Sequence, residues 1–136
     1  HTFTASHGQH ALDLLEKHPE IDVVVSDHNP QGTEQKDLEF VRANYGISSI
    51  ELLFPLLIEL NVDFLDFLVY NPRKILKLDT SKIEEGADAK LTFYSTSDEQ
   101  KIDKNWFKSK SFYSPFSGKT VKGKVIGTFN NNIFSN

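Results

Sequence analysis

A short apolar run in the first quarter of the chain restricts the fold more than any other feature. Residues 21–25 read Ile-Asp-Val-Val-Val, which is typical of a strand buried on both faces of a parallel sheet. Residues 26–32, Ser-Asp-His-Asn-Pro-Gln-Gly, follow directly. In barrels and open α/β sheets the carboxyl ends of strands carry the chemistry. We therefore expect a buried parallel strand over 21–25, with Asp27 and His28 at a functional site.

The first part of the chain is otherwise helical in pattern. Apolar residues recur at helical spacing in residues 10–18, 50–60, 62–70 and 73–78. Pro19 ends the first helix, and Pro55 should lie in the first turn of the second or kink it. Asn61 separates the second helix from the third. Asn71-Pro72 is expected to end the third, because the residue before a proline avoids helical backbone angles.

From Leu91 onward the pattern changes to a period of two. Aromatic and β-branched residues alternate there, with turn residues at Gly118, Gly123 and 130–132. This second part is expected to be all-β. The sequence therefore predicts two units, residues 1–80 and residues 81–136.

Composition excludes several classes of function. The net charge of −4 argues against nucleic-acid binding, which needs a basic surface. Seven lysines between residues 101 and 124 are interpreted as a solvated sheet surface. The absence of cysteine excludes disulfides and fits a cytoplasmic location. Charged residues interrupt the longest apolar stretch, so no membrane segment is expected.

Several segments, in order, resemble one enzyme family. They are Ser-Asp-His-Asn-Pro (26–30), Tyr-Gly-Ile-Ser-Ser-Ile-Glu (45–51), Asn-Pro-Arg-Lys-Ile-Leu-Lys-Leu (71–78), Ile-Glu-Glu-Gly-Ala-Asp-Ala-Lys-Leu-Thr (83–92), and Ser-Lys-Ser (109–111) with Ser-Pro-Phe-Ser-Gly (114–118) and Val-Lys-Gly-Lys-Val (121–125). Together they resemble the dihydroorotase branch of the amidohydrolase superfamily. The resemblance covers roughly residues 9–136.

This resemblance implies an α/β fold followed by β structure. Residues 1–80 would be the last strand and helices of a metal-dependent (β/α)₈ barrel, and residues 81–136 part of a small β-sandwich domain. Such a barrel takes about 250 residues, whereas the chain has 136. The resemblance therefore implies the carboxyl-terminal third of an enzyme, and this segment alone is expected to be inactive.

Asp27 is the candidate catalytic residue. Amide hydrolysis needs an activated water and a proton for the leaving nitrogen, and a carboxylate can move that proton. The resemblance implies that Asp27 is both a metal ligand and the general acid/base. It also implies that His28 binds a substrate carboxylate and that Pro30 and Gly32 offer main-chain groups to the ring amide. From the residues alone, Asp27 could instead cap a helix or form a turn.

The cofactor implied by the resemblance is zinc, as one or two ions, with the remaining ligands outside this segment. The implied reaction is the interconversion of dihydroorotate and N-carbamoyl-aspartate in pyrimidine biosynthesis. Allantoinase and hydantoinase are alternatives, because Asp27 would serve any cyclic amide. A non-catalytic dihydroorotase-like subunit is a third possibility, because residues 2–6 depart from the family's Asn-Pro-Pro-Leu-Arg-like segment. Expected partners are a small-molecule substrate, and a second copy or another pyrimidine-pathway protein.

Two further groups of residues have a simpler interpretation. Glu34, Lys36, Asp37 and Glu39 are expected to form a solvated helix start beside the site. The aromatic residues Trp106, Phe107, Phe112, Tyr113 and Phe116 are expected to pack the β-region rather than to stack on a ligand.

Overall fold

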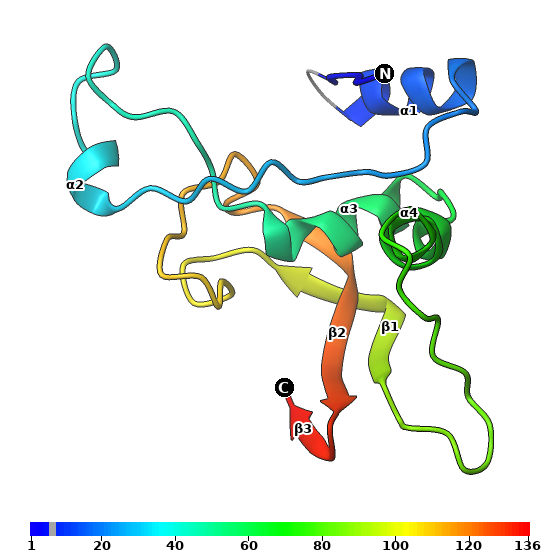
Figure 1. Ribbon diagram of the computed structural model, residues 1–136. Coiled ribbons are helices and arrows are strands. Elements are labelled where there is room, and N and C mark those ends of the chain that lie inside the picture. The colour runs from blue at the N-terminus through cyan, green and yellow to red at the C-terminus, as the bar shows by residue number, and fades with distance from the viewer. Residues whose placement is uncertain (6–7) are drawn as a thin grey trace.

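The computed structural model describes residues 1–5 and 8–136, so Ser6 of the departing segment lies outside the described residues. The elements are α1 (Gly8–Lys17), α2 (Thr33–Lys36), the 3₁₀-helix η1 (Ile50–Leu52), α3 (Leu53–Glu59), the π-helix η2 (Asp66–Tyr70), α4 (Asn71–Ile75), β1 (Leu91–Lys101), β2 (Thr120–Asn130) and β3 (Ile133–Ser135). Figure 1 shows α3 at the centre, with the sheet on one side and a long irregular segment from α1 to α2 on the other.

The first two predicted helices are confirmed. Helix α1 ends at Lys17, just before Pro19. Elements η1 and α3 together cover the predicted second helix. Pro55 is the third residue of α3, so it lies in the first turn, where proline is tolerated.

The predicted break at Asn71-Pro72 is wrong. The chain is helical from residue 64 through η2 and α4 to residue 75. Pro72 lies in the first turn of α4, directly after the π-helix. A proline cannot donate a hydrogen bond, and its ring collides with the carbonyl four residues earlier. The wider π turn before Pro72 relieves this collision, so the helix continues past the proline.

The predicted β-region is confirmed as a three-stranded antiparallel sheet in the order β1-β2-β3. Strand β1 pairs with β2 from Leu91 opposite Phe129 to Lys101 opposite Thr120, with two irregularities in register. Asn131 and Asn132 connect β2 to β3, and both have positive φ angles, 48° and 60°. Two such residues form the tight hairpin turn that matches strand twist. The predicted sandwich and barrel stay predictions.

The buried core joins the helical and the β parts of the chain. Leu52 packs with Ile102, Phe107 and Val121, and three of the partly buried residues around them are aromatic (Trp106, Phe112 and Phe116). The aromatic residues therefore pack the β-region, as expected. This core contains residues from both predicted units, because Leu52 comes before residue 80 and Val121 after it. The division near residue 80 stays a prediction.

A second aromatic cluster spans the same two parts. The rings of Phe54, Phe64 and Tyr94 meet edge to face, with centroid separations of 5.1, 5.4 and 5.5 Å. Such edge-to-face pairs add stabilisation beyond the buried area. Helix α3 is thereby fixed against the sheet.

The predicted strand over residues 21–25 does not form in this structure. These residues have no strand assignment, and Val25 is 76% exposed. A buried parallel strand needs a hydrogen-bonded strand on each side, and the described part of the chain supplies none here. One anchor is present, because Asn71 Nδ2 donates to the carbonyl oxygen of Asp22 (3.0 Å).

Candidate functional site

Asp27 lies in the irregular segment at the point where it passes the start of η1. Its φ angle is 48°, in the left-handed region, which aspartate and asparagine tolerate better than most residues. The side chain is exposed. The carboxylate has no hydrogen bond or ion pair with the rest of the described chain. It is therefore available to water, metal or substrate.

His28 is held by the start of the 3₁₀-helix η1. The backbone N–H groups of Ser49 and Ile50 both donate to its Nδ1, each at 3.1 Å. The first N–H groups of a helix have no partner within the helix, so an acceptor side chain is favourable there. Because Nδ1 accepts, the ring proton is on Nε2. His28 therefore has one nitrogen fixed by the protein and one N–H left for another partner.

The segment 45–49 runs alongside Asp27 and His28. The Asn29 N–H donates to the Ile47 carbonyl (3.2 Å), and the Ser49 hydroxyl donates to the Ser26 carbonyl (2.9 Å). Gly46 is required by this close approach, because a Cβ atom at that position would collide with the Asn29 carbonyl oxygen. These contacts fix the path of the backbone on both sides of Asp27.

Pro30 and Gly32 lie at the start of α2. The Gly32 N–H donates to the Gln35 side chain (2.8 Å), and the Gly32 carbonyl accepts from the N–H groups of Gln35 and Lys36. Pro30 has no N–H, so it can offer only its carbonyl. The main-chain groups of Gly32 thus cap the helix in this structure.

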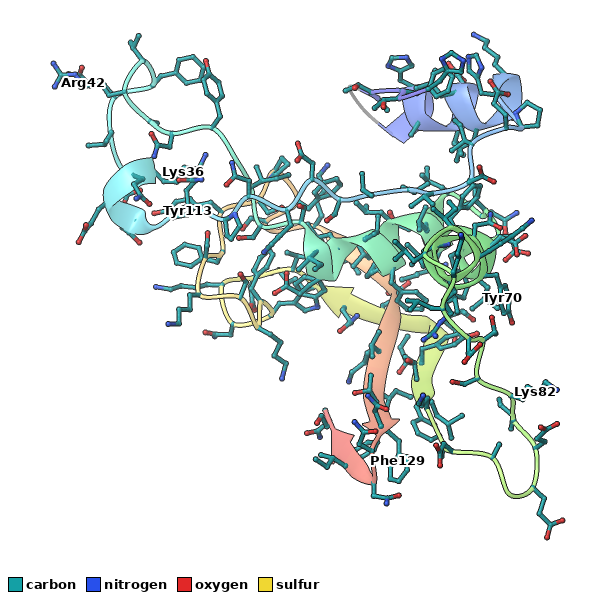
Figure 2. The ribbon with its side chains drawn as sticks, in the orientation of Figure 1. Lys36, Arg42, Tyr70, Lys82, Tyr113 and Phe129 are labelled. Atoms are coloured by element: carbon teal, nitrogen blue, oxygen red, sulfur yellow. The ribbon has the colours of Figure 1, made fainter. Side chains whose placement is uncertain are left out.

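The charged residues after Gly32 do more than face solvent. Lys36 Nζ donates to the Asn44 carbonyl (2.8 Å), and Tyr113 Oη donates to Asp37 Oδ1 (2.9 Å). Figure 2 shows Lys36 and Tyr113 beside α2, with Arg42 at the far end of the loop. Arg42 lies 3.8 Å from Glu39 in an exposed pair, which contributes little. Two of these charged residues therefore fasten the loop that follows the site.

Sequence reasoning missed Ser49 and Tyr113. Ser49 is only 7% exposed, and its partners Ser26 and His28 lie more than 20 residues away. The sequence offered one weak signal, two adjacent serines directly before the apolar helix. The sequence predicts Tyr113 to be one of the packing aromatic residues, but its hydroxyl also donates to Asp37.

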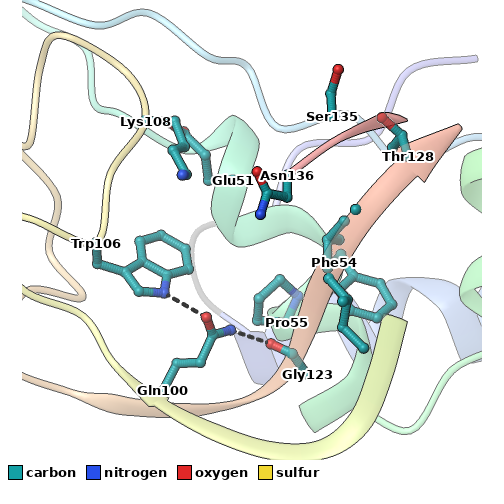
Figure 3. A pocket seen from close by; sticks show the side chains of 13 residues that line it. Glu51, Phe54, Pro55, Gln100, Trp106, Lys108, Gly123, Thr128, Ser135 and Asn136 are labelled. Atoms are coloured by element: carbon teal, nitrogen blue, oxygen red, sulfur yellow. Dashed lines mark hydrogen bonds between the residues drawn. The ribbon is translucent and has the colours of Figure 1, made fainter. Parts of the chain in front are cut away.

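A metal centre is not assembled by the described residues alone, which contain no group of three or more His, Cys, Asp or Glu side chains able to hold an ion. Asp27, exposed and without a partner among the described residues, fits the role of a single metal ligand. A cavity of about 490 Å³ lies away from Asp27 and His28, between α3 and β2, with Trp106 and Gln100 on one wall (Figure 3).

Among the described helices, none is long and apolar enough to cross a membrane.

No protein-family model matches the chain. The dihydroorotase of Ehrlichia canis (strain Jake) is 36% identical over 115 residues, which cover 79% of this chain and 26% of that protein. The dihydroorotase of Listeria welshimeri is 32% identical over 117 residues, which cover 80% of this chain and 28% of that protein. The chain therefore spans about a quarter of the length of these curated relatives.

A solved structure shares the fold. The chain matches a D-hydantoinase (dihydropyrimidinase) from Thermus sp. with a TM-score of 0.69 and 25% sequence identity. The match covers 93% of this chain and 30% of the hydantoinase chain. The sequence relatives and the structural neighbour agree with the resemblance that the motifs indicated. The chain belongs to the dihydroorotase family, within the amidohydrolase superfamily.

Proposed function

We propose that the full-length protein containing this chain is a cyclic amide hydrolase that interconverts dihydroorotate and N-carbamoyl-aspartate in pyrimidine biosynthesis. Its curated relatives carry the name dihydroorotase. The observation that supports this most directly is the pair Asp27 and His28. A free carboxylate stands next to an imidazole that is anchored through Nδ1 and has its Nε2–H available.

Asp27 would act as general base and then as general acid. Ring opening requires water to attack the amide carbonyl and the ring C–N bond to break. The Asp27 carboxylate would take one proton from the attacking water and return it to the leaving nitrogen, so that the carboxylate is regenerated. An exposed carboxylate without a protein partner is free to make both transfers.

Zinc is the proposed cofactor, as one or two ions. Asp27 would be one of its ligands, and a zinc ion would supply Lewis-acid activation for the hydrolysis. His28 would bind the substrate carboxylate through Nε2–H. Pro30 would offer its carbonyl to the ring amide, and Gly32 would do so only by exchanging a helix-cap hydrogen bond for one to substrate.

Allantoinase and hydantoinase are the alternative activities, and the hydantoinase neighbour favours the second of these. We also propose a cytoplasmic location, which the absence of cysteine supports, and assembly as a homodimer or with another pyrimidine-pathway protein. A non-catalytic subunit is the alternative from outside the enzyme class.

A substrate panel tests the proposal. The full-length protein, purified with zinc supplied, would be assayed for ring opening of dihydroorotate, a 5-substituted hydantoin and allantoin. We expect the highest kcat/KM with dihydroorotate. A higher kcat/KM with hydantoin or allantoin would assign the alternative activity. If a folded, zinc-loaded protein turned over none of these rings, the non-catalytic subunit would be the remaining function.

A further inference from the structure

Ser49 contacts both chain neighbours of Asp27. Its hydroxyl donates to the carbonyl of Ser26 (2.9 Å), the residue before Asp27. Its backbone N–H donates to Nδ1 of His28 (3.1 Å), the residue after Asp27. Ser49 is 7% exposed, so water competes little for these bonds. One buried residue thereby holds Asp27 from both sides.

Asp27 needs such support because of its backbone conformation. A φ angle of 48° is less favourable than right-handed angles even for aspartate, which tolerates it better than most residues. Strained angles of this kind persist only where the surroundings fix them. Among the described residues no strand pairs with this segment, and residues 26, 28 and 29 form hydrogen bonds with residues 47, 49 and 50.

Ser49 is itself attached to the rigid part of the molecule. Its neighbour Ser48 is fully buried, and the Ser48 hydroxyl donates to the Ser111 carbonyl (2.8 Å). The Ser48 N–H donates to the Tyr113 carbonyl (2.9 Å). Leu52, three residues further on, belongs to the core. The two serines therefore have different partners. Ser48 binds the loop between β1 and β2, and Ser49 binds the segment that carries Asp27.

We propose that Ser49 is a positioning residue, whose hydroxyl bonds the Ser26 carbonyl and so holds the backbone that places the Asp27 carboxylate where it can exchange a proton with the attacking water. This proposal rests on the proposed function for its effect on catalysis, but the positioning itself can be measured separately. Removal of the hydroxyl should release the Ser26 carbonyl and let residues 26 and 27 move, while the backbone N–H groups of Ser49 and Ile50 still hold His28. A misplaced carboxylate slows the chemical step and leaves substrate affinity nearly unchanged.

Ser48→Ala is a matched control for Ser49→Ala. Each substitution removes one buried hydroxyl that donates to a distant backbone carbonyl, at 2.8 Å for Ser48 and 2.9 Å for Ser49. We expect similar decreases in Tm for the two variants of the full-length protein. Hydrogen–deuterium exchange of peptides covering residues 21–32 should become faster only in Ser49→Ala. Ser49→Thr, which keeps a hydroxyl, should exchange more slowly than Ser49→Ala.

Kinetics complete the test. We expect Ser49→Ala to lower kcat at least tenfold with less than a twofold change in KM, and Ser48→Ala to keep the wild-type kcat. In an Asp27→Asn background the effect of Ser49→Ala should disappear, because the group that it positions is gone. Equal exchange in the two alanine variants would overturn the positioning role, and so would an unchanged kcat in Ser49→Ala. If Asp27→Asn alone retained full turnover, the proposed function would fail, and the exchange comparison would still decide whether Ser49 holds the segment.

Discussion

Asp27 and His28 are adjacent in sequence but differ in how firmly their side chains are held. The His28 ring is fixed by two N–H groups at the start of η1, whereas the Asp27 carboxylate has no partner in the described part of the chain. A fixed imidazole suits recognition, and an available carboxylate suits proton transfer. The two residues can therefore be tested by different kinetic constants.

Replacement of Asp27 by asparagine should remove the chemistry and keep the fold. Asparagine tolerates a φ angle of 48° as well as aspartate does, but its amide cannot take a proton from water. In the full-length protein we expect kcat to fall by about 10²- to 10⁴-fold. Circular dichroism and Tm should stay close to wild type. Wild-type turnover in this variant would show that another residue is the base.

Two substitutions of His28 separate its two nitrogens. In His28→Asn the Oδ1 atom can replace Nδ1 as the acceptor for Ser49 and Ile50, but nothing replaces Nε2–H. Loss of a hydrogen bond to a charged group costs about 1.5–3 kcal/mol, so KM should rise by about 10- to 100-fold with a smaller change in kcat.

His28→Gln is the complementary variant. It keeps a donor near the Nε2 position and loses the Nδ1 acceptor, which leaves two N–H groups of η1 unpaired. We expect a lower Tm and a smaller rise in KM than in His28→Asn. A larger rise in KM for the glutamine variant would mean that His28 acts through its contact with η1 rather than through substrate.

The sequence predicts Asp27 and His28 as site residues but does not indicate the residues that hold them. An acid and a histidine at the end of an apolar run form a local pattern, so they could be found without a structure. The bond from Ser49 to Ser26 depends on how residues 45–49 return along the chain. No local sequence pattern predicts this path of residues 45–49, because it is set by the long-range packing of η1 and α3.

At the scale of elements, α3 is the support on which the site rests, and its contact with β2 is unusually close at Gly123. This glycine has a φ angle of 98°, and a Cβ atom there would lie 3.2 Å from Ile58 Cγ1 and 3.3 Å from Phe54 Cε1. Helix and strand can approach this closely only because Gly123 has no side chain.

A pair of glycine substitutions measures this approach. Gly118 has a similar φ angle of 83°, but a Cβ atom there would have no neighbour within 4 Å. Gly118→Ala should therefore report backbone strain alone, about 1 kcal/mol. Gly123→Ala should cost about 2–4 kcal/mol, because steric crowding against α3 is added. Urea unfolding of both variants checks this, and equal costs would mean that α3 shifts freely to make room.

Prediction of the elements succeeded where local residue patterns decide the structure. Pro19 marked the end of α1, and the asparagines at 131 and 132 marked the β2–β3 turn. It failed for residues 21–25, whose apolar content predicts a strand only if neighbouring strands are present. It also failed at Pro72, where a π turn accommodated the proline.

At the scale of the whole molecule, the two clusters that join helices to sheet should hold the molecule together even after the chain is cut between them. Residues 79–90 form a connection without helix or strand that is exposed except at Ser81, and Lys82 lies in it, away from the body of the molecule (Figure 2). Limited trypsin digestion should cut there first. The pieces before and after the cut each hold one side of the Leu52–Val121 core and of the Phe54–Phe64–Tyr94 cluster.

The nicked molecule should therefore behave as a noncovalent complex of two peptides. We expect the pieces to elute together in native size-exclusion chromatography and to separate in urea, with refolding by complementation when the urea is removed. Separate elution without denaturant would mean that each half is stable alone. If complementation occurs, the connection serves only to tether the halves, and the placement of Asp27 depends on the second peptide, which contains neither Asp27 nor His28.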